Sequence, residues 1–318
     1  MLLPTAKLAS FIQPYCNDLN IPHLPEHLPT VIRSLLIWVS LQLLSSGLSP
    51  ILFPKTYPKL KKLTRISWDV HFVALVHACV ITPLAARIWW KIRQEGGLSG
   101  QHPLAVDRLY GYDRETAQVY AIALGYFIWD SFISIKYDGP GFIAHGLVAF
   151  TAMLLVFYPV FMYDGLGFLL WELSTPFLNI HWFLDKCGKT GSTAQLVNAI
   201  FLLSSYVGAR LTFGLYNSIG WFRFVVFPAT PHSPPLPKYI AIFYMVGNVT
   251  LNCLNFFWFR AMVRAVQKRF TAEPKPSGGQ LDPKKIVKGE QKVKVKVSGS
   301  GDEPFEKEAL IGKHEKGE

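Results

Sequence analysis

The run AQVYAIALGYFIWDSFISIK, residues 117–136, decides the fold class of this chain. An α-helix needs about 20 predominantly apolar residues to cross the hydrocarbon core of a bilayer, which is roughly 30 Å thick. This run has that length, and it contains a single acidic residue, Asp130. The sequence therefore predicts a helix that spans a membrane.

Similar apolar runs lie on both sides of this stretch. The expected spans are residues 31–53, 68–90, 117–136, 140–162, 164–183, 194–226 and 238–266. The fifth run contains Glu172, Pro176, Asn179 and His181, so it either crosses the membrane or forms a broken or re-entrant segment. We expect an all-α, polytopic bundle of about seven transmembrane helices that is integral to a membrane.

The composition agrees with a membrane protein. Hydrophobic residues make up 50% of the 318 residues and charged residues only 17%, whereas about a quarter of the residues in an average soluble domain are charged. The net charge is +11, but the basic residues flank apolar runs instead of clustering on one solvated face, which argues against nucleic-acid binding. The four cysteines are scattered and form no paired metal-ligand motif, so no metal site is predicted.

Basic residues in the connections predict the orientation of the bundle, because short cytosolic loops are enriched in Lys and Arg. They gather in residues 54–66, at Lys136, in residues 186–189 and in residues 260–269. All four groups face one side if all seven segments cross the membrane. We therefore expect the N-terminus outside the cytosol and the C-terminus in the cytosol, although loop 91–116 on the opposite side also carries basic residues.

Shifts in composition divide the chain into three parts. Residues 1–64 comprise a proline-rich lead-in, the first transmembrane helix and a basic cytosolic loop, and residues 65–269 form the main membrane domain. In residues 270–318, Pro, Gly, Ser, Lys and Glu replace the apolar residues. Such a segment cannot bury enough apolar surface to offset its ordering entropy, so we expect a disordered, charged cytosolic tail.

Two ionisable residues flank the tight connection at residues 138–140. Charged and strongly polar side chains inside spanning helices are costly, and they usually face the bundle interior and mark a site. Asp130 and His145 would lie at similar depth in an antiparallel hairpin. The pair is either a buried hydrogen bond between two helices, or a carboxylate that orients a catalytic imidazole.

The fifth run carries a second polar group. Glu172, Pro176 and Asn179 are spaced at i, i+4 and i+7, which is one face of a helix. Pro176 cannot donate a hydrogen bond to the carbonyl of Glu172, so the helix should kink there and leave a free acceptor. The free carbonyl either accepts a hydrogen bond from a neighbouring helix, or the kink forms part of a substrate site.

Polar residues in the last two runs complete the set of candidates. Arg210 needs an anionic partner inside the membrane, and Glu172 and Asp130 are the available ones. In the last run, Asn252 is the middle member of a stripe of three asparagines at i, i+4 and i+7. Such a stripe either forms ordinary hydrogen bonds between helices or contributes to a polar pocket.

Three motifs resemble those of one family. They are GYFIWD at residues 125–130, GFIAHG at residues 141–146 and ELSTPFLN at residues 172–179. The chain resembles the TLC-domain family of endoplasmic-reticulum membrane proteins over roughly residues 65–269, and the third motif points to its uncharacterised TLC-domain branch. Ceramide synthases, to which the likeness is more distant, and translocating-chain-associated membrane proteins belong to the same family. The resemblance implies a six-helix core around an internal cavity, with an additional first helix in some members.

The resemblance also bears on catalysis. In ceramide synthases two adjacent histidines carry the transfer of an acyl group from acyl-CoA to a sphingoid amine, and the matching place here reads His145-Gly146. One histidine is retained and its neighbour is replaced. Asp130 corresponds to an acidic position that recurs in the family.

These residues leave three functions open. In the first, the bundle binds or handles a membrane lipid and contributes to lipid homeostasis without a cofactor. The lipid-binding residues would be Glu172, Asn179, Arg210 and Asn252.

In the second, the protein is an N-acyltransferase that uses acyl-CoA as co-substrate, with His145 as catalytic residue oriented by Asp130. In the third, it is a non-enzymatic partner of the translocon or of export from the reticulum. The chain could also form a homo-oligomer or bind other membrane proteins of the reticulum.

Overall fold

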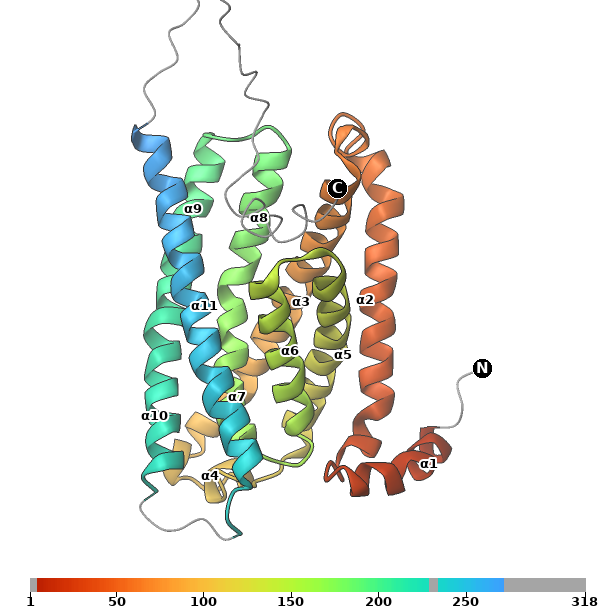
Figure 1. The fold of residues 1–318 in the computed structure, drawn as a ribbon, viewed down its shortest axis with the longest axis vertical. Helices are drawn as coiled ribbons and strands as arrows, with labels where there is room; N and C mark the ends of the chain where they lie inside the picture. Colours follow the sequence, from red (N-terminus) through yellow and green to blue (C-terminus); the bar gives the residue numbers. More distant parts are fainter. Residues whose placement is uncertain (1–4, 229–233, 272–318) are drawn as a thin grey trace, which may run out of the picture. The chain divides into compact units, whose positions relative to one another are not determined.

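A computed structural model describes residues 5–228 and 234–271, and these residues form helices and no strand (Figure 1). The α-helices are α1 (Thr5–Asp18), α2 (Leu24–Leu52), α3 (Lys62–Gln94), α4 (Pro103–Val106), α5 (Arg114–Tyr137), α6 (Pro140–Leu155), α7 (Met162–Leu169), α8 (Thr175–Lys186), α9 (Thr193–Tyr206), α10 (Gly214–Val226) and α11 (Lys238–Thr271). Short 3₁₀ segments are η1 (Tyr57–Lys59), η2 (Gly97–Ser99) and η3 (Leu170–Ser174), and η4 (Val207–Phe213) is a π-helix. The predicted all-α class is confirmed. The tail predicted from residue 270 lies almost entirely outside the described residues.

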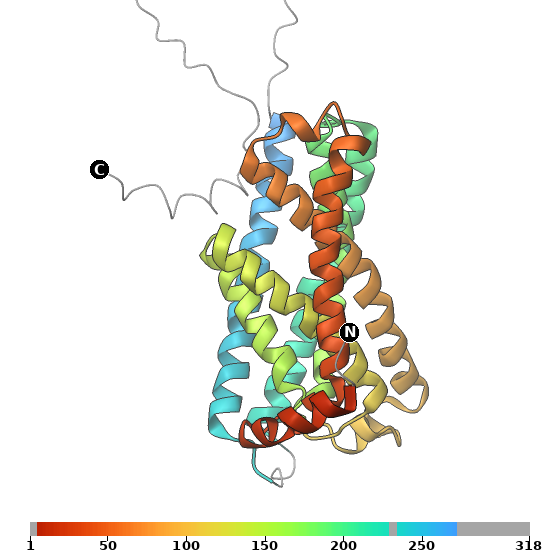
Figure 2. The same ribbon diagram turned by 90° about the vertical axis from the view of Figure 1, so that its right-hand side faces the viewer.

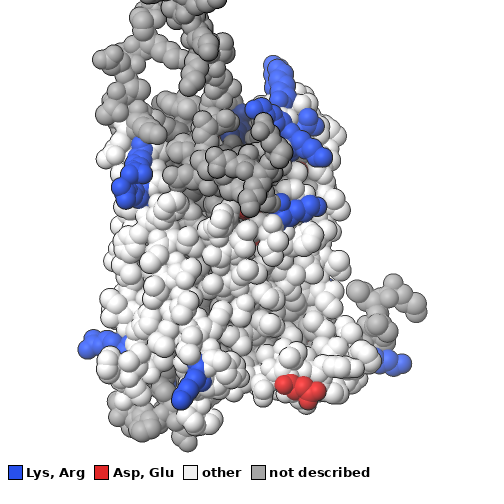
Figure 3. Space-filling model, viewed as in Figure 1, with Lys and Arg blue, Asp and Glu red and all other residues white. Residues whose placement is uncertain are grey.

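Five helical stretches among the described residues are long and apolar enough to cross a membrane. They are α2, α3, α5, the continuous run α9–η4–α10, and α11 up to residue 267. They coincide with five of the seven predicted spans, and α6, with 16 residues, covers most of a sixth. The face drawn in Figure 3 has a broad uncharged band, as expected of a protein surrounded by lipid. The chain is thus a polytopic membrane protein.

The remaining predicted span, residues 164–183, is broken rather than continuous. It consists of α7, η3 and α8, and Pro176 lies in the first turn of α8. Proline is tolerated there, because its missing N–H has no intrahelical acceptor at a helix start. The interruption therefore falls at residues 170–174, just before the proline.

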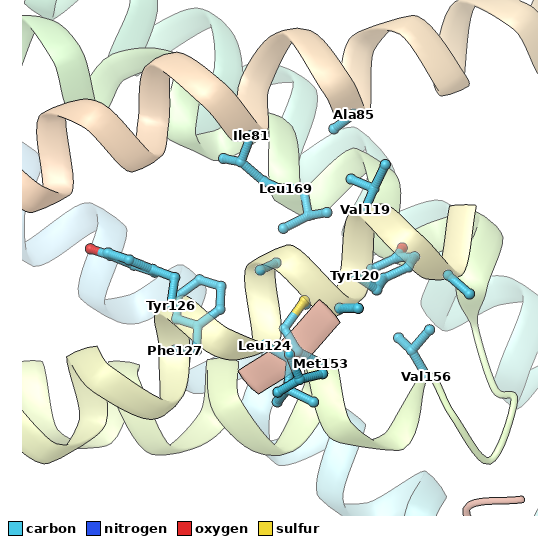
Figure 4. Packing of buried hydrophobic residues seen from close by; sticks show 14 of the residues in the cluster. Ile81, Ala85, Val119, Tyr120, Leu124, Tyr126, Phe127, Met153, Val156 and Leu169 are labelled. Atoms are coloured by element: carbon cyan, nitrogen blue, oxygen red, sulfur yellow. The ribbon is translucent and has the colours of Figure 1, made fainter. Parts of the chain in front are cut away.

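Helix α5 forms the centre of the main hydrophobic core. Two thirds (67%) of its most apolar window is buried, against 33% or less for the other four spanning stretches. Figure 4 shows its side chains Tyr120 and Leu124 among residues of α3, α6 and α7, including Ile81, Met153 and Leu169. The hydrophobic cluster thus joins the GYFIWD motif in α5 to α7 of the broken span.

The proline-rich lead-in contains a helix of its own. Helix α1 runs across the end of α2 in both ribbon views (Figures 1 and 2). Cys16 in α1 and Ile21 in the following turn are buried in the main cluster. The lead-in is therefore fixed to the bundle by apolar contacts.

Candidate functional site

A partly open cavity lies among α5, α6, α7, η3, η4, α10 and the first half of α11. The volume of the cavity is about 90 Å³. The cavity is thus small, and most of its lining is apolar or aromatic. The polar residues of the lining are His145, Asp164, Glu172, Arg210, Tyr244 and Asn248.

Arg210 connects the cavity wall to the broken span. Its Nε donates to the carbonyl of Trp171 and to Ser174 Oγ, both at 3.1 Å, and a terminal nitrogen lies 3.8 Å from Glu172 Oε1. Further donors reach Thr175 Oγ1 and Asn255 Oδ1, at 3.3 and 3.2 Å. The guanidinium therefore supplies hydrogen bonds at the break in the span, since a backbone carbonyl without a partner is costly inside a membrane.

The position of Arg210 depends on a local change in helix type. Arg210 lies in η4, where the π-helical winding interrupts the run from α9 to α10. Such wide turns are rare, and they are frequent at functional sites. Arg210 and Glu172 are both buried, with 7% and 9% of their surface exposed. The predicted pairing of Arg210 with an anion is thus found with Glu172.

A second ion pair lies at the cavity wall in α7. Arg108, in the connection between α4 and α5, contacts both carboxylate oxygens of Asp164, with its shortest contact at 2.5 Å. The guanidinium also lies 4.4 Å from the ring centroid of Phe224. Sequence reasoning missed this pair, because Asp164 stands at the edge of an apolar run and Arg108 in a loop. An acid at the end of a predicted span was the available signal.

His145 and Asp130 lie on the two helices of the α5–α6 hairpin, and only His145 lines the cavity. A Cβ atom at Gly146 would lie 3.3 Å from Asp130 Oδ2, so the carboxylate sits against the backbone of α6 beside His145. Asp130 is absent from the described lining residues. The structure thus brings the two residues to adjacent positions on the hairpin and orients one of them toward the cavity.

Asn179 and Asn252 lie outside the cavity lining. Asn179 Oδ1 is 2.6 Å from His71 Nδ1 of α3, and Asn252 donates to Ser218 Oγ of α10 at 3.0 Å. Glu172 lines the cavity and faces Arg210, whereas Asn179 contacts α3, so the two side chains of the third motif have different partners.

Metal-binding clusters are absent from the described residues, where no group of three or more His, Cys, Asp or Glu side chains could hold a metal ion. The described cavity has an apolar wall that carries an imidazole, two carboxylates and a guanidinium.

Comparisons with known proteins agree with the motifs. The TLC domain model matches residues 67–264. An uncharacterised TLC domain-containing protein of Schizosaccharomyces pombe is 33% identical over 88% of this chain and 93% of its own length. Topoisomerase I damage affected protein 4 of Saccharomyces cerevisiae is 27% identical, with 86% of this chain and 94% of the relative covered.

A vertebrate relative has the same domain. TLC domain-containing protein 4-A of Xenopus laevis is 26% identical over 77% of this chain and 95% of its own length. No solved structure matches the chain significantly. The domain match extends from the start of α3 to the last helix, across all three sequence motifs, and the chain belongs to the TLC-domain family.

Proposed function

We propose that this protein binds or handles a membrane lipid in the cavity and so contributes to lipid homeostasis in the endoplasmic reticulum. The observation that carries the proposal is the apolar cavity among spanning helices, with the buried Glu172–Arg210 pair and His145 on its wall. In this proposal the protein is a multi-pass protein of the reticulum membrane with its C-terminus in the cytosol.

The apolar part of the wall suits a hydrocarbon chain. Ligand sites are typically apolar enclosures in which a few polar groups fix orientation. Burial of apolar surface contributes about 25 cal/mol per Å², and the small volume favours a thin chain over a bulky ring system. Side chains such as Val148, Met153 and Leu169 would contact the chain.

The polar part of the wall would hold the head group. Most donors of Arg210 go to protein oxygens, so its main role is to fix the position of Glu172 and of the break. Glu172 and His145 then offer an acceptor and a titratable ring to the ligand. Asn179 and Asn252 would act indirectly, through the helices that they join.

Native mass spectrometry of the purified protein tests this function. Ala149→Phe adds a ring to the cavity lining, where Ala149 is 7% exposed. Leu147→Phe on the same helix is the matched control, since Leu147 is 43% exposed and faces outward. We expect Ala149→Phe to lower the amount of co-purified lipid several-fold and Leu147→Phe to leave it unchanged. Equal lipid content in both variants and the wild type would contradict the proposal.

An acyltransferase is the second candidate, because His145 reaches the cavity. A base must lie within hydrogen-bond reach of the proton it removes. Incubation with acyl-CoA and a sphingoid base should then give an N-acyl product that His145→Ala abolishes. A lipid-binding role alone predicts no product, and it predicts that His145→Gln retains bound lipid.

A further inference from the structure

A second polar pair, outside the cavity lining, joins α3 to α8. His71 Nδ1 lies 2.6 Å from Asn179 Oδ1, and Asn179 Nδ2 donates to the carbonyl of Thr175 at 2.9 Å. A carbonyl only accepts, so the second contact fixes which end of the amide is nitrogen and leaves its oxygen facing the ring. Nδ1 must therefore carry the hydrogen, and Nε2 of the neutral ring carries a lone pair.

Aromatic side chains hold the imidazole in place. The Trp182 ring stacks on it with centroids 4.2 Å apart and planes 26° from parallel. Trp182 in turn meets Trp68 edge-on, with centroids 6.0 Å apart. The His71 side chain is half-buried. Its Nε2 atom has no hydrogen-bond partner among the described residues and is not fully enclosed. An oriented acceptor thus remains open to a ligand.

Lys186 brings a positive charge close to this pair. Lys186 acts electrostatically on the His71 ring, and its Nζ lies 5.2 Å from the Trp182 ring centroid. The neighbouring α2–α3 and α8–α9 connections contain Lys55, Lys59 and Lys189. A nearby cation disfavours an imidazolium and repels a cationic ligand, whereas it attracts a phosphate.

The pair lies toward the N-terminal end of α3. His71 is nine residues from the start of α3 at Lys62, which corresponds to about 13 Å of helix at about 1.5 Å per residue. A phosphate near the helix ends could thus belong to a lipid whose polar substituent reaches inward along α3.

We propose that His71 and Asn179 form a binding site for an anionic phospholipid whose head group carries a hydroxyl. The hydroxyl donates to His71 Nε2, and the phosphate lies toward Lys186. Asn179 positions the ring by holding its tautomer. This site is independent of the cavity, so each proposal can fail without the other.

A pair of lipids with equal charge tests the site. Phosphatidylglycerol has hydroxyls on its head group, and phosphatidylmethanol has the same single negative charge without a hydroxyl. The full chain is placed in phosphatidylcholine nanodiscs that contain one or the other, and retained lipid is counted by native mass spectrometry. We expect wild type to retain phosphatidylglycerol about fivefold better, the effect of one hydrogen bond.

Variants locate the preference. His71→Phe keeps a ring for the Trp182 stack and should retain both lipids equally. Asn179→Leu should weaken the preference, because the hydrogen of the His71 ring is then no longer held on Nδ1. His23→Phe, a histidine change before α2, is the control and should behave as wild type. A preference that survives in folded His71→Phe protein overturns the proposal.

Two outcomes with the wild-type chain decide the case even if a variant fails to fold. Equal retention of the two lipids overturns the proposal. Displacement of phosphatidylglycerol by millimolar glycerol 3-phosphate overturns the assignment to a lipid, because a soluble phosphate ester would then be sufficient for binding.

Discussion

Arg210 is the side chain on which the polar contacts at the broken span converge. Its guanidinium contacts η3, the start of α8 and Asn255 of α11, and it balances the charge of Glu172. A lysine ammonium is a point charge and cannot reproduce this fork of donors. Arg210 therefore acts as a structural centre of the site as well as a part of its wall.

Arg210→Met should lower the free energy of unfolding by about 3–5 kcal/mol, because it leaves the buried carboxylate of Glu172 without compensation. The double variant Arg210→Met with Glu172→Gln should recover part of this loss. Thermal unfolding in detergent, followed by intrinsic fluorescence, measures both. Equal stability of the single and double variants would show that the carboxylate does not depend on Arg210.

His23, just before α2, predicts a pH dependence. Its ring stacks on Tyr112 with centroids 3.9 Å apart, and burial lowers the pKa of His23 below its ordinary value of 6.5, while Glu26 opposes this in part. The unfolded chain then binds the proton first as the pH falls. This contribution to stability is complete above pH 6.5 and is lost as the pH falls from there toward the folded pKa.

The measurement is the unfolding temperature between pH 7.5 and pH 5.5. His23→Phe keeps the aromatic stack and removes the titration, so its unfolding temperature should fall less over this range than that of wild type. An identical slope for the two proteins would rule out His23 as a source of the pH dependence.

Some residue contacts could be predicted from the sequence and others could not. A guanidinium inside a span requires an anion, so charge alone limits the partner of Arg210 to Glu172 or Asp130, and the structure shows Glu172. The contact of Asn179 with His71 could not be predicted, because the two residues are 108 positions apart in the sequence and no charge or motif pairs them. The roles of all the candidate residues in lipid binding stay predictions.

At the level of helices, Gly125 of the GYFIWD motif sets the distance between α5 and α2. A Cβ atom there would lie 2.6 Å from Ser34 Cβ and 2.7 Å from the carbonyl oxygen of Val31. The two helices form the most extensive contact between helices in the described chain. The absence of a side chain at this position therefore allows the central helix to pack closely.

Gly125→Ala should destabilise the bundle by about 1–3 kcal/mol, the usual cost of an added group in a well-packed core. Gly220→Ala in α10 is the matched control, since a Cβ there meets nothing within 4 Å. Alanine at an open helical position should stabilise by up to about 1 kcal/mol. Opposite shifts of the unfolding temperature are thus expected, and equal shifts would contradict the packing argument.

The spanning helices could be predicted from local sequence. Each helix forms its backbone hydrogen bonds internally, so it requires only an apolar run of sufficient length. The break at residues 170–174 was only partly predictable. Pro176 marks its neighbourhood, but Arg210, which donates to the carbonyl of Trp171 in the break, is distant in sequence and cannot be assigned to it from the local pattern. The same holds for the π-helical segment η4.

The whole molecule has two ends with different connections. The α2–α3 connection and the segment that contains η2 and α4 lie at opposite ends of the bundle (Figure 1). The proposed orientation puts the first in the cytosol and the second in the lumen of the reticulum. A glycosylation acceptor inserted at Gly97–Gly100 should therefore be modified in cells, whereas one inserted at Lys55–Lys59 should not. Modification of the acceptor at Lys55–Lys59 alone would show that the protein has the opposite orientation.

Helix α6 has a consequence for the surrounding bilayer. Its 16 residues span about 24 Å at about 1.5 Å per residue, less than the roughly 30 Å of an average hydrocarbon core. Leu147 on this helix is exposed, so lipid would contact a helix that is shorter than the hydrocarbon core is thick. A short span is accommodated by local thinning of the bilayer. The leaflets beside α6 are therefore drawn together, and the polar surface of the membrane comes closer to the wall that carries His145.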